Sequence, residues 1–173
     1  METVQDKLTE IHAYYGKILG SKKDLQAGAC CSPLLIPAAH QNILAELDTE
    51  ILDRFYGCGS PIPPAIEGCT LLDLGCGSGR DVYLASKLVG PHGHVIGVDM
   101  TEEQLVVARK HVDNQSRRFG YDKPNVEFRQ GYIEDLAGCG IADNSIDVVI
   151  SNCVINLSPD KQRVFSEIFM VLK

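Results

Sequence analysis

Two groups of residues in the sequence can do chemistry: a glycine-rich stretch with acidic neighbours, and seven cysteines. The stretch is DLGCGSGRD at positions 73–81, and it follows an apolar run typical of a β-strand. Gly75 permits the turn at the end of that strand, Gly77 lets a ligand reach the backbone, and Gly79 allows a following helix to pack closely on the strand. With an acid also closing the next strand, this pattern favours a ligand site over a plain turn.

The spacing and charge of this stretch indicate which ligand it holds. The dinucleotide fingerprint is G-x-G-x-x-G, whereas the spacing here is G-x-G-x-G, and no P-loop lysine follows. Asp73 and Asp81 would repel a pyrophosphate placed at the start of the following helix. A cationic ligand without phosphate suits these carboxylates better. S-adenosylmethionine is such a ligand, because it carries a sulfonium and an ammonium group.

Further candidate ligand contacts follow the next three predicted strands. Asp99 closes the run HVIGVDM, where an acid can accept hydrogen bonds from ribose hydroxyls. In QGYIEDL, Ile133 is suited to lie against an adenine face and Glu134 to accept from the adenine amino group. Asn152 and Cys153, in SNCVINL, come at the carboxyl end of the fourth strand, where open α/β sheets bind their ligands.

These residues need a sheet to position them, and the second part of the chain predicts one. From position 70 onward, β-rich runs alternate with helical stretches, the signature of βαβ units and a parallel sheet. We therefore expect an α/β, Rossmann-like fold with strands at Thr70–Leu74, His94–Asp99, Asn125–Arg129 and Ile146–Ser151. The clearest crossover helix is Glu102–Phe119, which is expected to begin with a capping box of Thr101 and Gln104 and to end at Gly120.

The first part of the chain, residues 1–64, is expected to be a helical, cysteine-bearing segment before the ligand-binding region at 65–173. Apolar residues recur every three or four positions over Glu2–Leu19, and again from His40 to the glycines at 57 and 59, which predicts two amphipathic helices. The residues at 24–39 are predicted to form a loop that carries Cys30 and Cys31. The ending SEIFMVLK, with no further strand, would leave the fourth strand as an uncovered edge, so we expect a fragment of a longer protein.

The segments DLGCGSGRD, GVDMT, GYIEDL and SNCVINL, in this order, resemble the class I S-adenosylmethionine-dependent methyltransferases. More specifically, YYGKILGSKKDLQAGAC, FYGCG and SNCVINLSPDK resemble the arsenite methyltransferases, from about Tyr14 onward. The resemblance implies the first half of a class I methyltransferase sheet with four parallel strands. The expected cofactor-binding residues are Tyr56, Asp73, Gly75, Gly77, Ser78, Gly79, Asp99, Met100, Ile133, Glu134 and Asn152.

The same resemblance implies roles for three cysteines. Cys153 matches a cysteine that coordinates arsenic beside the methyl donor, Cys58 matches a second family cysteine that shares this site, and Cys30 matches a third. A fourth family cysteine lies further downstream, beyond Lys173. Thiolates are natural ligands for soft trivalent arsenic, and its lone pair can take up a methyl group without a general base.

The methylated product is formally oxidised, and the resemblance implies that enzyme thiols return it to the trivalent state by forming a disulfide. Cys30 and Cys58 are the expected relay pair, with a thiol reductant of the glutathione or thioredoxin type as the electron source. The other cysteines are predicted to be packing residues, namely Cys69, Cys76 and Cys139, whereas Cys31 is equally well a spare thiol.

Composition excludes several other classes. A net charge of −7 without a basic stripe argues against nucleic-acid and membrane partners, and no apolar run approaches the ~20 residues that span a bilayer. We expect a cytoplasmic monomer that acts in detoxification, with arsenite and methylated trivalent arsenicals as its partners. Two alternatives stay open: a methyltransferase acting on a small organic acceptor, and a non-catalytic module that binds S-adenosylmethionine or a metalloid.

Overall fold

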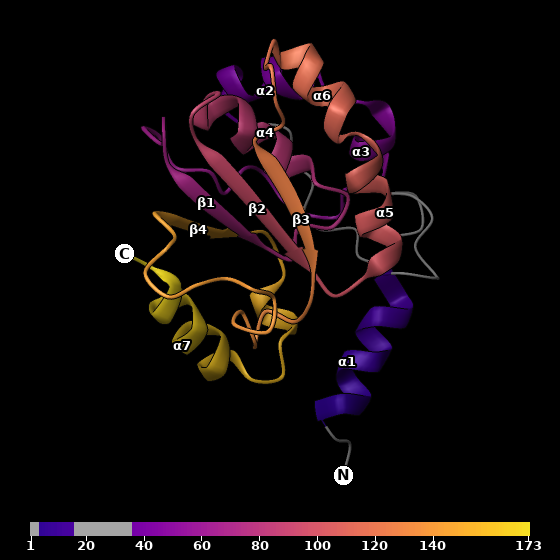
Figure 1. Ribbon diagram of the computed structural model, residues 1–173. Coiled ribbons are helices and arrows are strands. Elements are labelled where there is room, and N and C mark those ends of the chain that lie inside the picture. Colours follow the sequence, from indigo (N-terminus) through magenta and orange to yellow (C-terminus); the bar gives the residue numbers. More distant parts are fainter. Residues whose placement is uncertain (1–3, 16–35) are drawn as a thin grey trace.

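The computed structural model describes residues 4–15 and 36–173, so the predicted loop with Cys30 and Cys31 lies outside the described residues. Its centre is a parallel sheet with the strand order β3-β2-β1-β4 (Figure 1). The strands are β1 (Thr70–Leu74), β2 (His94–Asp99), β3 (Val126–Gln130) and β4 (Val148–Ser151). The predicted Rossmann-like arrangement is confirmed, and β1 and β2 have the expected bounds.

Helices cover both faces of this sheet, because both faces are apolar. Successive strand residues point to opposite faces, and Leu71 and Leu72 accordingly belong to two different hydrophobic clusters. One face packs against α4 (Arg80–Val89), α5 (Glu102–Lys110) and α6 (Val112–Phe119). The other face packs against α7 (Lys161–Val171), which follows the short 3-10 helix η4 (Ile155–Leu157). Figure 1 shows α7 on the side of the sheet away from α4.

The helices before the sheet differ from the prediction. The first, α1, covers Val4–Ala13, and the predicted continuation past residue 15 lies outside the described residues. The second predicted helix is two helices, α2 (Ala38–Leu44) and α3 (Thr49–Asp53). The single-helix prediction is wrong because Asp48 adopts an extended backbone and its side chain accepts a hydrogen bond from the Glu50 N–H, which starts a new helix.

The capping box predicted for the helix after β2 is also wrong. Thr101 is the N-cap residue of α5 but makes no side-chain cap hydrogen bond. The Gln104 amide instead donates to the backbone carbonyl of Tyr15, at 3.0 Å. The helix is moreover interrupted at His111, whose Nε2 lies 2.9 Å from a Glu50 carboxylate oxygen. Gly120 ends α6 in a left-handed conformation, as predicted.

Among the described residues, no helix combines the length and the apolar character that crossing a bilayer requires.

Candidate cofactor and thiol site

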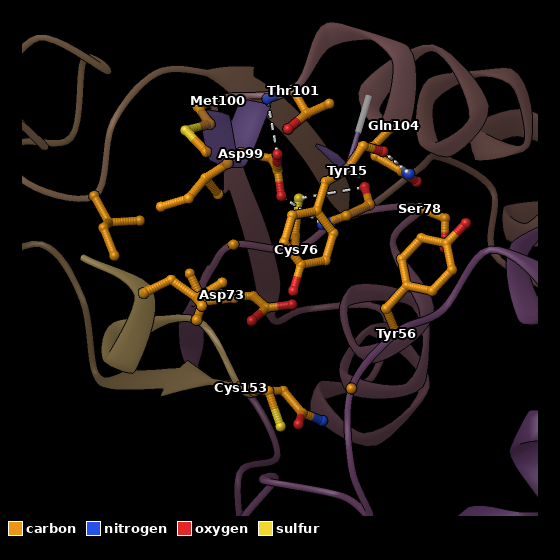
Figure 2. Close-up of a pocket in the computed structure, with 18 of the residues that line it drawn as sticks. Tyr15, Tyr56, Asp73, Cys76, Ser78, Asp99, Met100, Thr101, Gln104 and Cys153 are labelled. Atoms are coloured by element: carbon orange, nitrogen blue, oxygen red, sulfur yellow. Dashed lines mark hydrogen bonds between the residues drawn. The ribbon is translucent and has the colours of Figure 1, made fainter. Parts of the chain in front are cut away.

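A cavity of about 940 Å³, counted with its opening to solvent, lies where the four strands end. Segments that follow each strand line it, and α1 and residues 54–57 close it from the other side. Figure 2 shows Asp73, Asp99 and Cys153 arranged around this space.

The structure brings most of the predicted site residues to this cavity. They are Tyr56, Asp73, Gly75, Gly77, Ser78, Asp99, Met100, Ile133, Glu134, Asn152 and Cys153. Gly79 does not line it but begins α4 as a left-handed N-cap. Cys58 is not part of the lining either, although its sulfur lies next to that of Cys153. Cys30 lies outside the described residues.

The glycine loop leaves its backbone open toward the cavity. Gly77 has φ +53°, and a side-chain carbon built there would meet nothing within 4 Å, so a ligand has room to approach. Its N–H donates to Asp99 Oδ2 at 2.8 Å, and the other oxygen of Asp99 accepts from the Thr101 N–H, also at 2.8 Å. Asp99 thereby ties the loop after β1 to the turn after β2. A carboxylate has about four acceptor sites, so two backbone bonds leave capacity for ligand hydroxyls.

Asp73 brings a buried carboxylate to the cavity without a full set of partners. Its side chain is buried, and Oδ1 has no hydrogen-bond partner within the described part of the chain. Burial raises the pKa of this carboxyl well above its usual value; the nearby Asp81 and Asp99 charges raise the pKa further, and Arg80 opposes them. A buried acceptor without a partner costs free energy. The geometry therefore fits a ligand that supplies a donor or a positive charge.

The other end of the cavity is formed after β3. Ile133 is buried and offers an apolar surface there. The Glu134 carboxylate already accepts the hydroxyl of Ser158, so its remaining lone pairs are those available to a ligand.

Sequence reasoning missed the contribution of α1 to this site. Leu8, Ile11 and Tyr15 line the cavity, and the Tyr15 and Tyr56 rings lie 6.2 Å apart. The apolar period of α1 predicted a packed face, but nothing in it indicated that this face covers a ligand cavity. Burial raises the pKa of the Tyr15 hydroxyl, with smaller contributions from Tyr14 and Cys153.

Two of the predicted functional cysteines meet at the rim of the cavity. The Cys153 thiol donates to the sulfur of Cys58 at 3.0 Å, although 95 positions separate them in the sequence. Cys153 is exposed and has φ +60°, a conformation that non-glycine residues rarely adopt and that often marks functional sites. Two adjacent sulfurs can act together on one thiophilic ion.

The cysteines predicted to be packing residues do lie in or against the core. Cys76 and Cys139 belong to the two hydrophobic clusters, and Cys69 packs against the first of them. Cys76 also borders the cavity, where burial raises the pKa of its thiol well above the usual value and keeps it neutral.

One group of possible metal ligands lies elsewhere in the described part of the chain. The ligand atoms of Asp48, Glu50 and His111 lie within 4.8 Å of one another. The Glu50 carboxylate, however, is already bonded to Lys110 at 2.7 Å and to His111 at 2.9 Å. This arrangement is an ion-pair network that joins α3 to α5.

The fold and the cavity define the class of this protein. Residues 66–173 match the methyltransferase-domain family, and the chain belongs to that family. More specifically, it is similar to arsenite methyltransferases. It is 51% identical to the one from Aquipseudomonas alcaligenes over 163 residues, which are 94% of this chain and 46% of that protein. It is 47% identical to the one from Rattus norvegicus over 165 residues, or 95% of this chain and 45% of that protein.

A solved structure gives the same relationship in three dimensions. The crystal structure of an arsenic(III) S-adenosylmethionine methyltransferase from Chlamydomonas reinhardtii superimposes with a TM-score of 0.78 at 57% identity. The match covers 79% of this chain and 46% of that one. The chain thus spans about half the length of the relatives it matches.

Proposed function

We propose that this chain carries the methyl-donor site and two arsenic ligands of an S-adenosylmethionine-dependent arsenite methyltransferase. The observation that carries the proposal is the pair of sulfurs, 3.0 Å apart, at the rim of the cavity beside the glycine loop. The similarity to arsenite methyltransferases along 94% of the chain supports the same activity.

The residues of the cavity fit the methyl donor, which when bound supplies a methyl group on a cationic sulfur. Asp73 accepts from the ammonium group, which gives its unpartnered oxygen a donor. Asp99 accepts from ribose hydroxyls in addition to its two backbone bonds. Ile133 packs against the adenine and Glu134 accepts from its amino group. The open backbone at Gly77 leaves room for this ligand.

The remaining predicted contacts complete the cofactor site. Tyr56 and Met100 provide its apolar walls, and Ser78 donates its hydroxyl to the carbonyl of Ile51, which holds the glycine loop in place.

The sulfur pair holds arsenite as a substrate. Cys58 and Cys153 bind trivalent arsenic as thiolates, which raise the electron density on arsenic and keep its lone pair directed at the methyl group. The bound donor would supply the methyl group to this lone pair and keep the electrons of its carbon–sulfur bond. Because no proton is removed, no general base is needed.

The product is pentavalent arsenic, which needs two electrons to return to the trivalent state. Cys30 supplies them together with Cys58: the Cys30 sulfur, after losing its proton, attacks the arsenic-bound sulfur of Cys58, the sulfur–sulfur bond forms, and the arsenic–sulfur bond breaks with its electron pair left on arsenic. A small or protein thiol then reduces the disulfide. Such a transient disulfide suits a reducing compartment, so we place the enzyme in the cytoplasm, as a monomer that detoxifies arsenite.

The proposal is tested by incubating the chain with arsenite, glutathione and a donor carrying a deuterated methyl group, followed by mass spectrometry of the arsenicals. We expect labelled methylarsenic from the wild type and from Cys69→Ser, and none from Cys153→Ser. Labelled product at wild-type rates from Cys153→Ser would overturn the assigned role and favour an organic acceptor. Tight binding of the donor and arsenite without any product would identify a binding module.

A further inference from the structure

A row of three side chains, two of them buried and the third partly buried, connects the start of α4 to the backbone around Cys58. Arg80 and Asp81 are the first two residues of α4, and Asn152 follows β4. Arg80 is 4% exposed and Asp81 is 2% exposed. Buried polar groups of this kind hold a defined geometry only when every member is bonded, and the partners of this row lie on both sides of Cys58.

Arg80 holds the residues before and after Cys58. Its Nε and Nη2 donate to Asp81 Oδ1 at 2.9 and 2.6 Å, which fixes the plane of the guanidinium. Nη2 also donates to the Gly59 carbonyl at 2.5 Å, and the guanidinium carbon lies 3.3 Å from the centre of the Phe55 ring. The planar, delocalised guanidinium makes both contacts at once, which a lysine ammonium cannot do.

Asn152 completes the row from the other side. Its amide nitrogen donates to Asp81 Oδ2 at 2.8 Å, and its amide oxygen accepts from the backbone N–H of Cys58, also at 2.8 Å. Gly57 permits this approach, because a side-chain carbon there would lie 2.7 Å from the Asn152 side chain. Asn152 was expected to contact the cofactor; it lines the cavity, and these two bonds use one of its two amide N–H groups and one lone pair of its oxygen.

We propose that Arg80, Asp81 and Asn152 are positioning residues that hold the Cys58 sulfur against that of Cys153. The inference deepens the proposed function and rests on it, since the sulfur pair is its arsenic site. Cys153 directly follows Asn152, and the Asn152 side chain accepts from the Cys58 N–H. Asn152 therefore holds the backbone at both cysteines. Because Asp81 lies in the first turn of α4, directly after the glycine loop, the row also fixes the sulfur pair relative to the methyl-donor site.

An amide is required at position 152 because its neighbours are different: a carboxylate on one side and an N–H donor on the other. Asn152→Asp would set two carboxylates against each other and lose the hydrogen bond to Asp81. Combining Asn152→Asp with Asp81→Asn restores the hydrogen bond between positions 152 and 81, with the donor now at 81 and the acceptor at 152. The aspartate at 152 then accepts from both the Cys58 N–H and the new amide at 81, while that amide's oxygen still accepts from Arg80.

The test measures how readily Cys58 and Cys153 form a disulfide in equilibrium with glutathione, in a Cys30→Ser, Cys31→Ser background. One oxidised glutathione and the two thiols give the protein disulfide and two reduced glutathiones, so the equilibrium constant reports the effective concentration of one thiol at the other. We expect Asn152→Asp to lower this constant at least ~10-fold and the double exchange to return it to within ~3-fold of wild type. Asn42→Asp, at an exposed position of α2, is the matched control and should change nothing.

The positioning role would be overturned if Asn152→Asp left the equilibrium constant unchanged. It would also be overturned if the constant of the double exchange were no higher than that of Asn152→Asp. If Asn152→Asp does not fold, as judged by circular dichroism, the comparison of the double exchange with Asn152→Ala decides in the same way. The second measurement titrates phenylarsine oxide, which binds two neighbouring thiols. If wild type fails to bind it while the glutathione constants follow the expected order, the proposed function fails and the positioning role stands.

Discussion

Replacing Asp73 with asparagine should stabilise the folded chain at neutral pH and at the same time weaken binding of S-adenosylmethionine. Asp73 is fully buried, Oδ1 has no partner within the described residues, and Asp81 and Asp99 lie close enough to repel its charge. Asparagine keeps the shape and removes the charge, so we expect a higher free energy of unfolding at neutral pH. The gain is about 1.4 kcal/mol for each unit by which the folded state raises the pKa of Asp73.

The effect should depend on pH in a defined direction. The pKa of Asp73 is raised in the folded state, so the folded chain binds this proton more tightly than the unfolded chain does. The wild type therefore loses stability as pH rises from the usual aspartate value of about 4 through the raised value. The advantage of Asp73→Asn should be absent near pH 4 and full above the raised pKa.

Thermal unfolding followed by circular dichroism measures the first effect. For a chain of this size, 1 kcal/mol shifts the melting temperature by about 2–4 °C. Calorimetric titration measures the second: loss of a hydrogen bond to a charged group, worth about 1.5–3 kcal/mol, weakens binding about 10- to 150-fold. Binding to wild type should also release protons, because the cationic ligand favours the ionised carboxylate.

The matched control is Asp143→Asn, at an exposed position, which should alter neither quantity. An Asp73→Asn chain that melts no higher than wild type at pH 8 and binds S-adenosylmethionine equally tightly would refute the reasoning.

Three further substitutions test other parts of the site and fold. Gly77→Ala adds a side chain at φ +53°, so we expect a loss of about 1–2 kcal/mol in unfolding experiments and weaker S-adenosylmethionine binding. Gln104→Ala removes the hydrogen bond to the Tyr15 carbonyl, two residues after α1, and should speed hydrogen exchange in α1 with little change in melting temperature. The pKa of Glu50 is lowered by hydrogen bonds from Lys110 and His111, so Glu50→Gln should lower stability at neutral pH. The difference from wild type should disappear as acid protonates the wild-type carboxylate. Melting temperatures of both proteins measured over a pH series test this expectation.

The central strands were predictable from sequence because β1 and β2 are apolar runs bounded by glycines and polar residues, whereas β3, VEFRQ, is mostly polar and begins one residue later than predicted, and β4 begins two residues later. Buried parallel strands must be apolar on both faces, so β1 and β2 could be placed residue by residue. The helix interruptions could not, because they depend on contacts between distant segments. Asp48 starts α3 through a local hydrogen bond that competes with the amphipathic period, and His111 lies between α5 and α6 where it meets Glu50.

The candidate site was predictable in its residue types more than in its arrangement. The carboxyl ends of parallel strands meet at one edge, so Asp73, Asp99 and Asn152 were expected together. The sulfur pair followed from the family resemblance, while its 3.0 Å separation depends on the fold of residues 55–59 against β4. The contacts of Asn152 with Asp81 and the Cys58 N–H could not be predicted, because these partners are far apart in sequence.

Arsenic binding by the sulfur pair is tested most directly by X-ray absorption at the arsenic edge, combined with an arsenite titration, on wild type and on the Cys58→Ser, Cys153→Ser and Cys69→Ser variants. We expect sulfur-coordinated arsenic in wild type and Cys69→Ser, and at least ~10-fold weaker binding when either member of the pair is replaced, because one chelating thiol is lost. Equal affinity and equal sulfur coordination in Cys58→Ser and Cys153→Ser would contradict the assignment of this pair as the arsenic site.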